Sequence, residues 1–226
     1  MWTPPEYKTT TDSLPVLYMP DGGIKEDFPH IANTLAALIA AKKISPILLV
    51  GIENTQRRRD LTGPTEIAKD KEIAPVVGGS AAFRAFIARE LFAEINKKYR
   101  TTARKGIIGE SLAGLFVTET LLWQPDLFDF YIAFDPSVWW NDKYLLRTAT
   151  ERLKQFPTTP KVFWLASSGA ADIAATTGKL ADVLNTKGPQ NLKFEYSAEP
   201  AEKHNTIFRA TKEKALIWAL NANTAP

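Results

Sequence analysis

The sequence predicts a three-layer α/β fold in which a mostly parallel sheet lies between helices. Six short apolar segments alternate along the chain with longer segments of helical period. Several short segments are apolar on both faces, which suits strands buried in a parallel sheet. With 226 residues, of which 45% are hydrophobic, the chain can bury a substantial core. We therefore expect residues 1–226 to form a single domain.

The order of the elements follows from these periods. The predicted strands are 14–20, 45–52, 105–109, 128–134, 161–167 and 191–197. The predicted helices are 31–43, 80–98, 112–123, 142–155, 174–187 and 206–221. Segment 53–79 fits neither period, and its Pro, Gly and charged residues predict a long surface excursion, which in a compact domain is usually disordered or functional.

Composition and charge argue against several classes of function. The net charge is only +3, and the one basic run, Arg57-Arg58-Arg59, is followed at once by Asp60, so nucleic acid is not an expected partner. The chain has no cysteine and two histidines, which exclude a Cys-based metal site and leave little for a His-rich one. We expect no metal and no cofactor.

Membrane and targeting signals are also weak. No stretch approaches the ~20 apolar residues of a membrane span. The start, MWTPPEYKTTT, has neither the basic nor the apolar region of a secretory signal. This start resembles the interior of a longer chain, from which a signal could have been removed. The sequence therefore does not decide between the cytoplasm and a periplasmic or secreted location. The oligomeric state is equally open.

The stretch KGIIGESLAGLFVTE places Ser111 between a predicted strand and a predicted helix. Gly109, Ala113 and Gly114 surround it, and a nucleophile elbow needs such small neighbours because larger side chains would collide with the strand and helix. The backbone N–H of Leu112 would then point toward a developing oxyanion. The alternative is that Ser111 only caps the helix. Alanine at position 113, where the pattern has glycine, weakens the match without breaking it.

A serine nucleophile needs a general base, and in the fold that carries such an elbow this histidine lies later in the chain, with an acid between them. His204 lies in the predicted loop before the last helix, whereas His30 lies upstream, where capping or exposure is expected. Asp172, after the penultimate strand, is the candidate acid, with a helix cap as the equal alternative. Glu202 is a poorer candidate, and a Ser111–His204 dyad needs no acid.

The segment LPVLYMPDGG ends in Asp21-Gly22-Gly23. Backbone without side chains can approach a ligand closely, so Gly22 or Gly23 could supply the second oxyanion donor. A plain turn is the alternative.

These features together resemble an esterase family that includes esterase D-like enzymes, periplasmic siderophore esterases and feruloyl esterase domains, all of the α/β-hydrolase fold. The similar stretches, in chain order, are TPPEY, LPVLYMPDGG, ILLVGI, RRRDLTGPT, FRAFIARELFAEINKKYRT, GIIGESLAGLFVTETLL, FDFYIAFDPSVWWND, GAAD and EKHNTIF. They cover nearly the whole chain. Family members usually carry one or two further strands before TPPEY, so the resemblance implies that N-terminal strands are missing here.

The resemblance implies Ser111 as the nucleophile, His204 as the base and Asp172 at the acid position, where glutamate is more usual. Leu112 with Gly22 or Gly23 would form the oxyanion hole. Trp139 and Trp140 match aromatic residues near the mouth of the family's site, with core packing as the alternative for at least one.

The expected activity is therefore hydrolysis of a small-molecule carboxylic ester through an acyl-enzyme. Excursion 53–79 and its Arg59 are expected to help shape the substrate pocket, although such a charge run can equally be a solvated face. Two other readings stay open. One is a non-catalytic binding protein of the same fold, and the other is an acyltransferase with a sugar or alcohol acceptor.

Overall fold

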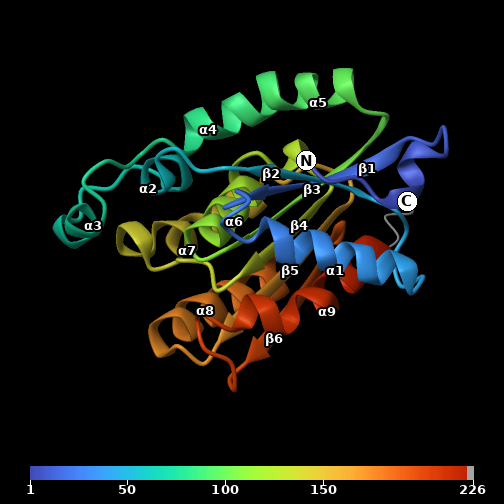
Figure 1. Ribbon diagram of the computed structural model, residues 1–226. Helices are drawn as coiled ribbons and strands as arrows, with labels where there is room; N and C mark the ends of the chain where they lie inside the picture. Colours follow the sequence, from blue (N-terminus) through green and yellow to red (C-terminus); the bar gives the residue numbers. More distant parts are fainter. Residues whose placement is uncertain (223–226) are drawn as a thin grey trace.

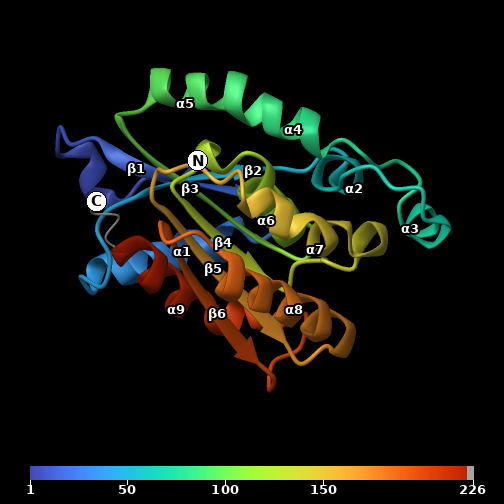
Figure 2. The same cartoon turned by 180° about the vertical axis from the view of Figure 1, so that it is seen from behind.

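The computed structural model describes residues 1–222 and contains a six-stranded sheet with helices on both faces (Figures 1 and 2). The strands are β1 (Leu14–Pro20), β2 (Leu48–Ile52), β3 (Thr101–Glu110), β4 (Phe130–Phe134), β5 (Lys161–Ser168) and β6 (Leu192–Glu199). Their spatial order is β2-β1-β3-β4-β5-β6, and every neighbouring pair is parallel. The predicted three-layer α/β fold is confirmed.

The main helices divide between the two faces of the sheet. They are α1 (Phe28–Ala40), α4 (Ser80–Phe86), α5 (Phe92–Lys98), α6 (Leu112–Trp123), α7 (Trp140–Leu153), α8 (Ala171–Lys187) and α9 (Ile207–Asn221). On one face, a core cluster joins the sheet to α4, α5, α6, α7 and α8. On the other face, a second cluster joins it to α1 and α9. Successive strand residues fall in opposite clusters, as Leu17 and Tyr18 do, because strand side chains alternate between faces.

The structure refines three of the predicted segments. The helix predicted over 80–98 is continuous in direction but contains a π-helical turn, η2 (Ile87–Leu91), between α4 and α5. Excursion 53–79 contains two short helices, α2 (Arg57–Leu61) and α3 (Ala68–Ile73). Strand β3 starts at Thr101, four residues before the predicted start, and its first part pairs with β1 across a register shift. Short 3-10 turns, η1 (Pro5–Lys8) and η3 (Pro125–Leu127), precede β1 and β4.

Parallel pairing places the carboxyl ends of all six strands at one edge of the sheet. In such sheets ligands bind in the crevice outside that edge. The loops after β1, β3, β4 and β6, which contain Asp21, Ser111, Asp135 and His204, all start there. Within residues 1–222 no helix is both long enough and apolar enough to cross a bilayer.

Candidate active site

Ser111 occupies a strained turn between β3 and α6. Its φ is 59° and its ψ is −119°, a conformation that costs a non-glycine residue on the order of 1–3 kcal/mol. The turn is held from both sides, because the N–H of Ser111 donates to the carbonyl of Phe134 (3.0 Å) and its carbonyl accepts from the N–H of Leu115 (2.8 Å). This is the geometry of a nucleophile elbow.

The small residues around the serine are required by close contact between β3 and α6. A Cβ added at Gly109 would lie 2.8 Å from the Cβ of Ala113, and one added at Gly114 would lie 2.8 Å from the carbonyl oxygen of Phe134. Real Cβ atoms do not approach so closely. Ala113 is accommodated because Gly109 opposite it has no side chain, which explains how the elbow tolerates alanine where the pattern has glycine.

Three side chains from three loops form a hydrogen-bonded chain. His204 Nε2 lies 3.2 Å from Ser111 Oγ, and His204 Nδ1 lies 2.9 Å from Asp135 Oδ2. In the tautomer that carries its proton on Nδ1, the imidazole donates to Asp135 and leaves Nε2 to accept from the serine hydroxyl. The relation of serine, histidine and carboxylate is that of a hydrolase triad.

Asp135 is completely buried at the end of β4, and its backbone is fixed there. Its N–H donates to the carbonyl of Ala166 (2.9 Å), and its Oδ1 accepts the N–H of Ser168 (2.5 Å). Its φ is 41°, a left-handed conformation that aspartate adopts more readily than most residues. The second carboxylate oxygen is thereby left for His204.

Asp172, the acid expected from the sequence, lies elsewhere. It is exposed in the first turn of α8. Its negative charge contributes to a raised pKa at His204, but the carboxylate that hydrogen-bonds to the imidazole belongs to Asp135. Glu202 is also turned away from this role, since its carboxylate accepts the hydroxyl of Thr206 (2.7 Å).

The GAAD segment instead supports the loop that carries the histidine. The N–H of Gly169 donates to the carbonyl of Glu202 (2.9 Å), two residues before His204. A Cβ at Gly169 would lie 2.4 Å from the carbonyl oxygen of Pro200, so the two loops can approach only at a glycine. Asp135 was not among the expected site residues, although the sequence carries a signal for it, an aspartate directly after a buried strand in FDPSVWW.

A second carboxylate, Glu110, lies beside the reaction centre at the end of β3. Burial raises its pKa to about 7, and the negative charges of Asp27, Asp135 and Asp21 act in the same direction, while His204 opposes them. The pKa of His204 is raised mainly by its hydrogen bond to Asp135; burial acts against this, and the charge of Glu110 adds to it. The histidine and Glu110 thus influence each other's protonation.

The backbone donors proposed for an oxyanion hole differ in availability. Leu112 is the first residue of α6, so its N–H has no intrahelical acceptor and lies at the positive end of the helix. The N–H of Gly22 donates to the carbonyl of Ile52 (3.0 Å). The N–H of Gly23 donates to Glu26 Oε2 (2.6 Å). In this conformation both glycine donors are engaged.

The predicted pocket residues lie in three different settings. Trp140 is buried and lines a cavity between α4, α6 and α7, whereas Trp139 is half-buried against the core. Arg59 pairs with Asp60 (2.7 Å) and lines a neighbouring cavity with Asn54.

Arg57, rather than Arg59, reaches the loop after β1. Its guanidinium forms two hydrogen bonds of 2.7 Å to the carboxylate of Asp21. Among residues 1–222, no group of three or more His, Cys, Asp and Glu side chains is arranged to hold a metal ion.

Sequence comparison identifies a family and several relatives of this chain. The family model described as "Putative esterase" matches residues 1–220. Ferri-bacillibactin esterase BesA of Bacillus subtilis is 38% identical over 198 residues, which cover 79% of this chain and 68% of BesA. The siderophore triacetylfusarinine C esterase of Aspergillus fumigatus is 37% identical over 111 residues, 47% of this chain and 35% of that protein.

Solved structures agree with this relationship. An IroE-like serine hydrolase from Shewanella oneidensis superposes with a TM-score of 0.87 at 25% identity, over 96% of this chain and 73% of that one. Siderophore hydrolase EstB from Aspergillus nidulans has the same fold, with a TM-score of 0.77 at 19% identity over 97% of this chain and 86% of its own. The family model spans almost the whole chain, and BesA is similar over two thirds of its own length, so the chain belongs to the "Putative esterase" family.

Proposed function

We propose that this chain hydrolyses small-molecule carboxylic esters through an acyl-enzyme, with Ser111 as the nucleophile, His204 as the base and Asp135 as the residue that orients the base. The proposal rests chiefly on the hydrogen-bonded chain from Ser111 Oγ through the imidazole to Asp135 Oδ2. The family model matches residues 1–220, and all six strands belong to one sheet. Both observations support one catalytic domain.

The proposed reaction follows from these positions. His204 Nε2 takes the proton of Ser111 as its oxygen attacks the ester carbonyl, and the resulting imidazolium is stabilised by the carboxylate of Asp135. His204 then protonates the leaving alcohol, and an acyl-enzyme remains. Water, deprotonated by the same nitrogen, attacks the acyl carbon and regenerates the serine. Formation of an acyl-enzyme distinguishes a hydrolase from a non-catalytic binding protein of the same fold, in which none would form.

The tetrahedral oxyanion needs two donors. We assign one to the N–H of Leu112, because the dipole of α6 adds to its hydrogen bond. Gly22 is a poor second donor because its N–H pairs with Ile52 at the end of the sheet. Gly23 is the better one, since its acceptor is the side chain of Glu26, which can rotate away.

The relatives suggest a class of ester. BesA and the triacetylfusarinine C esterase are both named for siderophore substrates. We propose an ester of this class as the substrate, with hydrolysis rather than transfer to a sugar or alcohol as the outcome. Product analysis with and without added alcohol separates these two outcomes.

The direct test is hydrolysis of p-nitrophenyl esters of increasing acyl length by the wild type, Ser111→Ala and His204→Ala. Loss of a nucleophile or its base can cost up to about 10⁶ in kcat, and we expect a loss of at least about a thousandfold in each variant. Ser13→Ala, on the exposed surface, and His30→Ala are the matched controls and should stay near wild type. Wild-type rates in a folded Ser111→Ala protein would refute the proposal.

The two candidate acids can be separated by replacing each with asparagine. Losing the residue that orients the histidine costs about 10⁴ in kcat in a true triad, so we expect Asp135→Asn to lower kcat by at least about a hundredfold. Asp172→Asn should change kcat by only a few-fold, since it removes only a charge near the imidazole. The reverse ranking, with both proteins folded, would return the acid role to Asp172, and small effects in both would indicate a dyad.

Glu110 should shift the acidic limb of the pH–rate profile, which reports the protonation of His204. His204 is active as a base only when neutral, and the negative charge of Glu110 raises the pKa of the imidazole. We expect Glu110→Gln to shift the acidic limb of kcat/KM to lower pH and to leave the high-pH plateau nearly unchanged. Glu94→Gln, an exposed glutamate paired with Lys98, is the control. A limb that stays in place or moves to higher pH would show that Glu110 does not influence the base in this way.

Removing Glu26 tests the second oxyanion donor. Because Glu26→Ala frees the N–H of Gly23 and removes a negative charge that competes with the oxyanion, we expect a several-fold rise in kcat/KM on p-nitrophenyl acetate, mainly in kcat. The control is Asn54→Ala. Asn54 donates to the other oxygen of Glu26 (3.0 Å), so this variant loosens the same loop but leaves the bond between Gly23 and Glu26 in place. An unchanged or lower kcat in the Glu26 variant would exclude Gly23 as the donor.

A further inference from the structure

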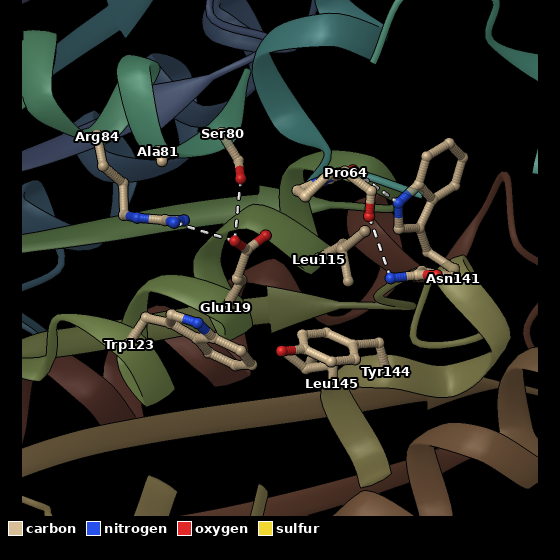
Figure 3. A pocket seen from close by; sticks show the side chains of 12 residues that line it. Pro64, Ser80, Ala81, Arg84, Leu115, Glu119, Trp123, Asn141, Tyr144 and Leu145 are labelled. Carbon is tan, nitrogen blue, oxygen red and sulfur yellow. Dashed lines mark hydrogen bonds and ion pairs between the residues drawn. The ribbon is translucent and has the colours of Figure 1, made fainter. Parts of the chain in front are cut away.

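A second cavity, the one that Trp140 lines between α4, α6 and α7, is drawn in Figure 3. It has a volume of about 250 Å³, opens to solvent beside Tyr144, and is lined by α4, α6, the start of α7 and the segment at Gly63 and Pro64. Ser111, His204 and Asp135 are not among its lining residues.

A carboxylate with one engaged oxygen forms the polar part of the cavity. Glu119 Oε1 accepts hydrogen bonds from Ser80 Oγ (2.9 Å) and Arg84 Nη2 (3.0 Å). Its Oε2 has no protein partner within residues 1–222, and in Figure 3 it points away from Arg84, on the side of Pro64 and Leu115. Gly63 leaves space in front of it, because a Cβ built there would lie 3.7 Å from both oxygens.

The remaining walls are mainly aromatic and aliphatic. Trp123 and Tyr144 lie with their ring centroids 6.0 Å apart, and Figure 3 shows both rings below the carboxylate. The one polar atom of the Trp140 side chain donates to the carbonyl of Gly63 (3.1 Å), so that indole offers its carbon surface. Flat apolar walls of this kind favour a ring, through offset or edge-to-face packing.

The charge of the carboxylate is already balanced. The side chains of Arg84 and Glu119 are only 4% and 13% exposed, so a further ion would add uncompensated charge to a poorly hydrated place. An added cation would also lie near Arg152, whose guanidinium is 4.5 Å from the centroid of the Trp123 ring. An anion would meet Glu119 Oε2 directly. A neutral hydroxyl, in contrast, donates a hydrogen bond to that oxygen without changing the charge.

We propose that this cavity binds a neutral, single-ring molecule that carries a hydroxyl group, of the phenol class. The ring packs among Trp123, Tyr144 and Trp140, and the hydroxyl donates to Glu119 Oε2. The volume supports a single ring, since it is below the range of about 300–1,000 Å³ found for drug-sized ligands. The inference does not depend on the ester hydrolysis proposed above, because it uses neither Ser111, His204 and Asp135 nor the proposed oxyanion donors. It does share Trp140, which the sequence had suggested for the substrate pocket.

The test is titration of the whole protein with phenol. Binding is measured from the shifts of the indole N–H signals of Trp123 and Trp140 in ¹H–¹⁵N NMR spectra. A ligand of seven heavy atoms is expected to bind with a dissociation constant of about 1 mM. Toluene, which has a methyl group in place of the hydroxyl, should bind at least fivefold more weakly, and benzylammonium and benzoate more weakly still. No shift with phenol at about ten times that concentration, equal binding of toluene, or tighter binding of either ion would overturn the proposal.

Gly63→Ala gives a matched structural test. Its methyl group reaches van der Waals distance of Glu119 without a backbone clash and fills the place of the hydroxyl, so phenol should bind at least fivefold more weakly. Gly178→Ala is the control, because a Cβ there meets only the Tyr196 hydroxyl, at 3.6 Å. Unchanged phenol binding in Gly63→Ala would overturn the proposal.

Glu119→Gln adds a second readout, since its amide N–H₂ would replace the acceptor and phenol should lose its advantage over toluene. Arg84 then loses its counter-charge, so thermal unfolding must confirm that this variant folds; where it does not, Gly63→Ala decides. Ser111→Ala separates this site from the reaction centre. It should keep phenol binding while losing esterase activity, and phenol-induced shifts of the His204 ring in place of the tryptophan signals would overturn the proposal.

Discussion

The buried carboxylate of Asp135 is the point on which the geometry of the reaction centre depends. It joins three separate parts of the sheet edge, because it follows β4, accepts the N–H of Ser168 at the end of β5 and contacts His204 in the loop after β6. A completely buried carboxylate is costly unless its oxygens are satisfied. Both oxygens have partners here, so the same contacts that make burial tolerable also fix where the imidazole lies.

The strained turn at Ser111 is coupled to the same point. Its N–H is held by the carbonyl of Phe134, the residue directly before Asp135, so the positions of the proposed nucleophile and of the carboxylate are set by adjoining peptide groups. The carbonyl of Ser111 also accepts the N–H of Ser137 (3.1 Å), two residues after Asp135. The unfavourable φ of the serine therefore persists because both flanks of Asp135 hold it, and close packing of Gly109 on Ala113 leaves little room for relaxation.

The parallel sheet and the elbow could be predicted from the sequence because they leave periodic and local signals. Apolar runs such as FDFYIAF mark buried strands, and the small residues around Ser111 mark the turn. Such signals name more than one candidate acid, because Asp172 and Asp135 both follow predicted strands, and only the spatial arrangement shows which of them reaches His204. The hydrogen bonds of the Gly22 and Gly23 N–H groups could not be predicted either, because their acceptors are the carbonyl of Ile52 and the side chain of Glu26.

Helix α6 is shared by the proposed active site, which lies at its N-terminus, and by the second cavity, which lies along one of its sides. Its N-terminus presents the Leu112 N–H, the proposed oxyanion donor, beside Ser111. Leu115, Glu119 and Trp123, each four residues apart, form one stripe along the second cavity. Glu119 is the charged residue of a helix that is otherwise buried and mostly apolar, so its ion pair with Arg84 and its bond to Ser80 fix α4 against α6. Excursion 53–79 ends at α4. The two contacts that hold the carboxylate of Glu119 therefore also hold the end of the excursion, whose Arg57 bonds to Asp21 at the carboxyl edge of the sheet.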